Sequence, residues 1–202
     1  RWPEFPDVPT LGELGMQDRD ELFKQVCRAL VDHGGFKLVW IGWLQEGNHE
    51  LTPLALAGNP TDYLEGIHVS VRDEPLGRGP SGTAFREGRT VVNNDTLGNV
   101  TLLPWHARAR EHGLLASVAM PIREGGVVRG ILTVYAGERG FFQDREVALL
   151  QEAALDTSFA LDHLARERDR AAAEARAQGE RSFSQMVLDS LPGIIYLIDE
   201  TG

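Results

Sequence analysis

The hydrophobic pattern is clearest between residues 114 and 136, where two apolar runs are joined by the short sequence Arg-Glu-Gly-Gly. Two such runs around a glycine-containing connection predict a β-hairpin. Alternate positions of the first run form an apolar set, Leu114, Ala116, Val118, Met120 and Ile122, and a small or mixed set, Leu115, Ser117, Ala119 and Pro121. Because a strand with little charge on either face is covered on both sides, we expect helices on the apolar face. The small side chains of the other face leave room for something else.

Patterns elsewhere predict an α+β domain around this hairpin. An amphipathic helix is expected from Asp18 to the glycine pair at 34 and 35, where glycine favours a helix end. The other predicted elements are strands over 36–45 and 50–57, a short helix near 61–66, a turn and helix within 75–88, a short strand at 89–92, a short helix at 105–112, and a long helix entered at Phe141.

Apolar residues in the long helix follow the alternating three-four spacing of a coiled-coil seam. We predict that this seam joins two copies of the chain as a homodimer. Its expected interface residues are Val147, Leu150, Ala154, Thr157, Leu161 and Leu164. Residues on other faces are expected to pack on the domain itself: Leu149, Ala153, Phe159 and Ala160.

Composition narrows the function classes. The 202 residues are 42% hydrophobic and 25% charged, as in ordinary globular domains. A net charge of -10, without a concentrated basic patch, argues against nucleic-acid binding. The single cysteine, Cys27, excludes intrachain disulfides and fits a reducing cytoplasm. The sequence contains no run of eighteen apolar residues, so we predict no membrane segment, and its two ends suggest a piece of a longer protein.

Candidate chemistry is sparse. No Ser-His-Asp or paired-carboxylate spacing stands out, so we do not expect an enzyme. If the mixed sheet face is a ligand pocket, the candidate lining residues are Trp40, Asp95, Trp105, His106, Ser117 and Tyr135. Ser117 and Tyr135 share a face only in one hairpin register, because a slip of one residue reverses every side chain. The connection permits a loop of three or four residues, so the register is left open.

Three motifs in order resemble a GAF domain, the small α/β sensor module of signalling proteins, over residues 18–164. They are the glycine-rich run at 77–95, the strand pair at 119–122 and 130–134, and the phenylalanine-led entry into the last helix at Phe141. The resemblance implies an antiparallel sheet with the first and last helices on one side. Short helices and loops would cover a pocket on the other side.

The segment 190–202 is similar to the opening of a PAS domain. Residues 1–17 would then be an extended lead-in, and 165–189 a linker helix that passes a signal to the PAS domain and to an output domain. In proteins of this kind the output is a diguanylate cyclase, a cyclic-dinucleotide phosphodiesterase or a histidine kinase. The resemblance therefore implies a bacterial, non-catalytic sensory module that binds a small ligand and dimerises.

The resemblance leaves the ligand and any cofactor unknown. The Asn-Lys-Phe-Asp-Glu set of cyclic-nucleotide GAF domains is not found, and Cys27 lies on the first helix rather than in a bilin-attachment position. The free methionine sulfoxide reductases of this fold need several cysteines, and the chain has one. Two alternatives remain: a structural dimerisation module whose pocket is filled by its own side chains, and a haem or metal sensor that uses a histidine.

Overall fold

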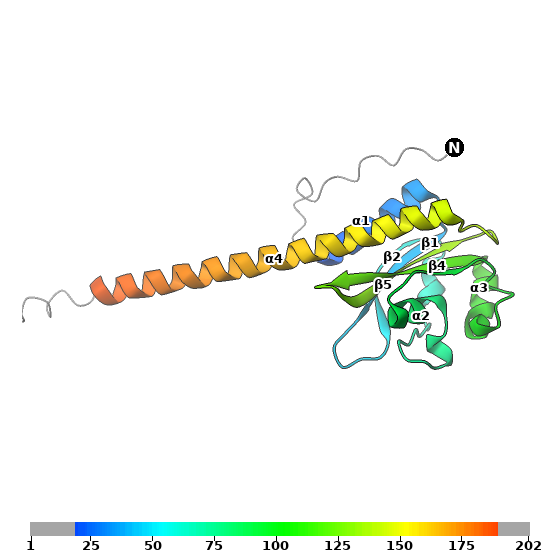
Figure 1. Ribbon diagram of the computed structural model, residues 1–202, viewed down its shortest axis with the longest axis horizontal. Coiled ribbons are helices and arrows are strands. Elements are labelled where there is room, and N and C mark those ends of the chain that lie inside the picture. Colours follow the sequence, from blue (N-terminus) through cyan, green and yellow to red (C-terminus); the bar gives the residue numbers. More distant parts are fainter. Residues whose placement is uncertain (1–18, 190–202) are drawn as a thin grey trace, which may run out of the picture. The chain divides into compact units, whose positions relative to one another are not determined.

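The computed structural model describes residues 19–189 and contains one antiparallel sheet of five strands in the order β2-β1-β5-β4-β3 (Figure 1). The strands are β1 (Leu38–Leu44), β2 (Leu51–Gly58), β3 (Val91–Asn93), β4 (Ala116–Glu124) and β5 (Val127–Ala136). β4 and β5 form the predicted hairpin, and β5 is the central strand. The expected α+β fold with an antiparallel sheet is confirmed.

The hairpin turn contains two residues, Gly125 and Gly126, rather than the three or four expected from the sequence. Both have positive φ, 60° and 80°, which is the backbone conformation that a tight two-residue turn requires and that glycine adopts without steric cost. A register shift follows Ile122, so the irregularity lies within the strand pair and not in a longer loop. The turn places Ser117 opposite Tyr135, in the one register that gives them a common face.

One face of the sheet is covered by α1 (Arg19–Gly34) and by the first part of α4 (Asp144–Asp189), as expected (Figure 1). The rings of Phe23 on α1 and Trp43 on β1 lie 5.4 Å apart. Alternate residues of the strands point toward these helices, and their side chains are apolar and buried: Val39, Ile41, Val118, Met120, Ile122, Leu132 and Val134. The alternation read from residues 114–122 is therefore the alternation between the two faces of the sheet.

The opposite face carries the short elements: α2 (Pro80–Glu87), α3 (His106–His112), and the 3-10 helices η1 (Thr61–Leu64), η2 (Pro75–Gly77) and η3 (Val100–Trp105) (Figure 1). Ala84 of α2 is buried in a cluster with Trp40, Leu51, Ala119 and Ile131. The N-terminal end of α2 is tied to the sheet by a hydrogen bond of 3.0 Å between the hydroxyls of Ser81 and Thr133. Between the short strand and the short helix predicted at 105–112, the chain forms η3, which the sequence pattern does not predict.

Four of the six residues predicted for the dimer seam are buried within a single chain. Leu150, Ala154, Thr157 and Leu161 are only 0%, 3%, 2% and 2% exposed within a single chain. The same three-four spacing also marks the apolar stripe by which an amphipathic helix packs on its own sheet, and here it serves that purpose. The other two, Val147 and Leu164, are partly buried. The structure contains one chain, so pairing itself stays a prediction.

Two of the residues expected to pack on the domain itself differ in their burial. Phe159 is 64% exposed, whereas Ala160 is buried as expected.

The compact unit ends at Asp162, and α4 continues as helix to Asp189 in a second unit. The lead-in at 1–17 and the PAS-like segment at 190–202 lie outside the described residues. Within residues 19–189, no helix has both the length and the apolar composition needed to cross a bilayer.

We predict that Leu150→Ala lowers the free energy of unfolding by about 2–5 kcal/mol, because it leaves a cavity between α4 and the sheet. Leu155→Ala is the matched control on the same helix; Leu155 is 68% exposed, so its loss should change stability by less than about 0.5 kcal/mol when both variants are measured at a concentration that keeps the chain monomeric. Urea denaturation followed by circular dichroism measures both. Equal small effects would mean that Leu150 does not pack against the sheet.

Candidate functional site

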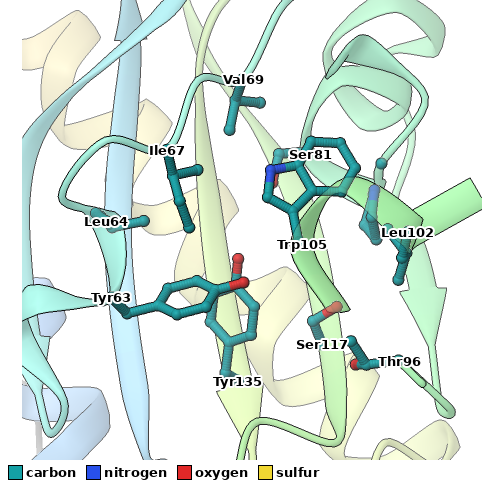
Figure 2. A pocket seen from close by; sticks show the side chains of 12 residues that line it. Tyr63, Leu64, Ile67, Val69, Ser81, Thr96, Leu102, Trp105, Ser117 and Tyr135 are labelled. Atoms are coloured by element: carbon teal, nitrogen blue, oxygen red, sulfur yellow. The ribbon is translucent and has the colours of Figure 1, made fainter. Parts of the chain in front are cut away.

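A cavity lies on the sheet face opposite α1 and α4, between the strands and the short elements (Figure 2). Its lining comes from η1, the segment after η1, the start of α2, η3, β4 and β5. The lining residues are Tyr63, Leu64, Ile67, Val69, Gly79, Pro80, Ser81, Thr96, Leu102, Trp105, Ser117 and Tyr135. Its polar groups are hydroxyls, backbone groups and one indole, and among residues 19–189 no Asp, Glu, Lys, Arg or His belongs to the lining.

The floor of the cavity is set by strand register. Ser117 on β4 pairs with Tyr135 on β5, and Leu38 on β1 pairs with the same tyrosine from the other side. Directly paired residues point to the same face, so the hydroxyls of Ser117 and Tyr135 both face the short elements. Ser117 is 3% exposed.

Two tyrosines meet at one end of the cavity. The rings of Tyr63 and Tyr135 lie 5.3 Å apart at 67°, an edge-to-face contact, and Figure 2 shows their hydroxyl groups side by side. Burial is the main cause that raises the pKa of both phenols above the ordinary range. The indole N–H of Trp40 and the Tyr63 hydroxyl act on the Tyr135 oxygen in the opposite direction and lower its pKa, but burial outweighs them.

Trp40 lies in the core beside this pair and not in the cavity lining. It is 1% exposed, and its indole nitrogen Nε1 has no hydrogen-bond partner within the described part of the chain. The N–H is thus near enough to influence Tyr135 electrostatically while the contact falls short of hydrogen-bond geometry. A buried N–H without an acceptor is rare in folded proteins.

Trp105 and Leu102 cover the other end. Both belong to η3, whose first turn is fixed by Asn99: the Asn99 side chain accepts from the Thr101 N–H at 3.0 Å and donates to Asn93 Oδ1 at 3.1 Å. The Asn93 amide in turn donates to Thr96 Oγ1 at 3.1 Å. This network of short polar side chains positions the cover without placing a charge in the cavity.

The tyrosine end is held by α3. Arg108 donates to the backbone oxygens of Asp62 and Tyr63, and the ring of His112 meets the Tyr63 ring edge-on at 5.9 Å. Buried nitrogens of both residues, Arg108 Nε and His112 Nε2, have no partner in the described region. Through these contacts α3 holds η1 in place, and with it the Tyr63 hydroxyl.

The cavity is small. The space open to the centre of a water-sized sphere is about 30 Å³, and one buried water needs roughly 10–15 Å³ on this measure. Anything larger than about two waters therefore requires a side chain to move. Trp105 rests against the backbone of Gly79, where an added Cβ would lie 3.0 Å from two of its ring carbons. Trp105 is the largest side chain in the lining, so its displacement would enlarge the space.

Of the six residues predicted for the pocket, Trp105, Ser117 and Tyr135 line the cavity. Asp95 does not: its carboxylate accepts from the Gly98 N–H at 3.0 Å and pairs with Arg139 at 3.1 Å. His106 does not either, because its Nε2 is bonded to the Asn99 carbonyl oxygen at 3.0 Å. Both side chains are used to fix the local fold, as polar residues at turns often are.

Several lining residues were not anticipated: Tyr63, Leu64, Ile67, Val69, Ser81, Thr96 and Leu102. Ser81 was read only as part of a helix start, and Tyr63 only as part of a short helix. Their contribution depends on loops that bring residues 63–69 and 79–105 over β4 and β5. Alternation within a strand carries no information about such loops.

The only thiol is remote from the cavity. Cys27 is fully buried on α1, which covers the other face of the sheet, and burial raises its pKa to about 12. No cluster of three or more His, Cys, Asp or Glu side chains with metal-binding geometry occurs among residues 19–189.

A family model for the GAF domain matches residues 16–162. The match covers more than half of the sequence and coincides with the compact unit described above, so this chain belongs to the GAF domain family. A search of curated protein sequences finds no significant match.

Solved structures with the same fold include both signalling proteins and enzymes. The GAF domain region of a putative membrane protein from Geobacter sulfurreducens PCA is 22% identical, with a TM-score of 0.60 over 71% of this chain and 93% of that one. A methyl-accepting chemotaxis protein fragment, residues 122 to 287, is 20% identical, with a TM-score of 0.60 over 74% and 92%. Free methionine-R-sulfoxide reductase from Neisseria meningitidis, solved with its substrate, is 18% identical, with a TM-score of 0.63 over 76% and 83%. At these identities the likeness establishes the fold alone.

We predict that Tyr63 and Tyr135 stay protonated for as long as the domain is folded. The pKa of each phenol is raised in the folded protein, whereas tyrosine in the unfolded chain ionises at about pH 10. The contribution of the two phenols to the free energy of unfolding is therefore fully present below that pH and is lost as the pH rises above it. Urea midpoints measured across this range should fall less steeply for Tyr63→Phe and Tyr135→Phe than for the natural chain. Phenolate absorbance that rises to its full extent before the chain unfolds would contradict the prediction.

Proposed function

We propose that this GAF domain is a non-catalytic sensory module that binds a small molecule in the cavity and passes its occupancy to α4. The observation that carries the proposal is the position of the cavity. Its floor is the hairpin β4–β5, and the opposite face of the same two strands is the surface on which α4 packs (Figure 1).

Two hydrogen bonds support a route from cavity to helix. The backbone N–H of Arg123 donates to Ser158 Oγ at 3.0 Å, and that of Gly125 donates to Asp162 Oδ1 at 2.8 Å. They attach the end of the hairpin to α4 within the compact unit. A ligand that shifts Ser117 or Tyr135 would therefore change the position of α4 on the sheet. This requires that the ligand bind two arrangements of α4 with different affinity.

The state of Cys27 supports a non-catalytic role. The methionine-R-sulfoxide reductases that share the fold are enzymes, but thiol chemistry in this chain would have to use Cys27. That thiol is buried on the face opposite the cavity, and its raised pKa keeps it protonated at neutral pH, whereas the thiolate is the reactive form. We propose that the signal continues through the rest of α4 to a PAS domain and an output domain in the cytoplasm.

A second candidate function is a structural module whose cavity is filled by its own side chains. The small free volume, about 30 Å³, favours it, as does the packing of Trp105 over the sheet. A self-filled cavity would be expected to use Leu103 as well, but this side chain is 64% exposed, which argues against the structural module. The two candidates differ in whether the protein retains a molecule.

Native mass spectrometry separates them. We expect the chain purified without denaturation to carry a small molecule in a fraction of the protein, and we expect Ser117→Leu to lose it because the larger side chain occupies the cavity floor. Ser182→Leu, on the exposed part of α4, makes the same chemical change elsewhere and should retain the molecule. A natural chain that carries nothing would favour the structural module. Equal retention by both variants would place the molecule outside the cavity.

We further propose that the chain forms a homodimer through the exposed side of α4. Leu155 is 68% exposed and lies outside the buried stripe of Leu150, Ala154 and Leu161. Phe183, farther along the same helix, is a second large apolar side chain that is mostly exposed, at 66%.

Leu155→Glu should therefore weaken the dimer by at least about tenfold in sedimentation equilibrium, because a charge would be buried at the interface. The variant should unfold at the same urea concentration as the natural chain when both are monomeric. A natural chain that stays monomeric at high concentration, or a variant that dimerises unchanged, would overturn this proposal.

A further inference from the structure

Three hydrogen-bond donors meet at the tyrosine end of the cavity. Trp40 Nε1 is donor-only, and it has no partner among the described residues. The hydroxyls of Tyr63 and Tyr135 each add a hydrogen. Two hydroxyls farther along the cavity are already engaged, Ser81 with Thr133 and Thr96 with the Asn93 amide, and Ser117 stands opposite Tyr135 on β4.

Strand register explains why Trp40 belongs to this group although it does not line the cavity. Trp40 pairs with Thr133, and two residues along each strand Leu38 pairs with Tyr135. Both pairs use the face that carries the cavity, so the Trp40 indole lies beside the Tyr135 side chain, where its N–H acts on the phenol oxygen. Tyr135 is thus the group through which the buried N–H can be satisfied.

The Tyr135 hydroxyl can rotate, and its direction decides the outcome. When the O–H points to an acceptor in the cavity, the lone pairs of the oxygen are free to receive the Trp40 N–H. Without a ligand, the O–H must find its acceptor among the neighbouring hydroxyls, of which Ser117 on β4 stands opposite Tyr135. An acceptor supplied by a ligand would therefore satisfy two donors at once, one directly and one through Tyr135.

The rest of the lining constrains the net charge of such a ligand. Within the described part of the chain no charged side chain lines the cavity, and the tyrosines remain neutral because burial disfavours their phenolate forms. An ionised ligand group would lose its hydration without gaining a counter-charge. The remaining walls, Ile67, Val69, Leu102 and the Trp105 ring, are apolar (Figure 2).

We propose that the cavity takes a small uncharged molecule whose carbonyl oxygen accepts a hydrogen bond from the Tyr135 hydroxyl and whose apolar part lies against Trp105. In this arrangement Tyr135 contacts the ligand, and Trp40 is a positioning residue that donates to the Tyr135 oxygen. The inference rests on the proposed sensory function, and it adds the chemical class of the ligand and the end of the cavity that recognises it.

Three probes that share a five-membered carbon ring test the chemical class of the ligand: cyclopentanone, cyclopentane and cyclopentanecarboxylate. Titration of the ¹⁵N-labelled full chain, followed by amide and indole N–H resonances, gives an affinity for each probe. We expect cyclopentanone to bind about tenfold more tightly than cyclopentane, as one additional buried hydrogen bond allows. The carboxylate should bind at least about tenfold more weakly than the ketone. The Trp40 indole N–H resonance should move downfield with cyclopentanone alone, a change that a merely structural role would not produce.

Matched variants locate the interaction. Tyr135→Phe removes only the hydroxyl and should abolish the tenfold preference for the ketone while leaving cyclopentane binding unchanged. Trp40→Phe should reduce that preference by a smaller factor. Trp43→Phe is the control, because Trp43 is buried on the other face of the sheet against Phe23, and it should leave all three affinities unchanged.

The possible results test the ligand class and the sensory function separately. Equal binding of ketone and cyclopentane, or tighter binding of the carboxylate, overturns the ligand class while the cavity remains a binding site. If no probe shifts the resonances of cavity residues, both the ligand class and the sensory function fail. The comparison of probes on the natural chain stands even if a variant does not fold.

Discussion

Everything at the candidate site depends on the pairing of β4 with β5, which the tight turn at Gly125 and Gly126 fixes. That register directs Val118 and its apolar neighbours to α1 and α4, and it directs Ser117 and Tyr135 to the cavity. A slip of one residue would exchange the two sets and put hydroxyls under the helices. The same pairing therefore determines both the stability of the domain and the chemistry of its cavity.

The cavity combines neutral hydroxyls with apolar walls, and this combination limits what it can do. It contains no group that is charged at neutral pH, and its tyrosines are held protonated by burial. Such a site can recognise shape and a few hydrogen bonds, but it cannot neutralise a charged ligand. Through Ser158 and Asp162, α4 is hydrogen-bonded to the end of the hairpin that forms the cavity floor. The proposed sensory role rests on this arrangement.

Much of the fold could be predicted because strand alternation and helix spacing are local properties of the sequence. They identified the hairpin, the two helices on one face and three of the twelve residues that line the cavity, Trp105, Ser117 and Tyr135. They could not tell which neighbour the stripe of Leu150, Ala154 and Leu161 would meet, since a sheet and a second helix demand the same spacing. They also could not place Tyr63 or Ser81, which reach the cavity through loops, nor show that Asp95 and His106 are engaged in local hydrogen bonds.

The central claim is that the cavity is a binding site that opens at Trp105 and not a filled part of the core. A crystal structure of the chain purified under native conditions tests it most directly. The account predicts density for a small molecule within hydrogen-bond distance of the Tyr135 hydroxyl, with the Trp105 ring displaced from Gly79 to make room. A cavity that contains only ordered water, with Trp105 still packed against Gly79, would contradict it.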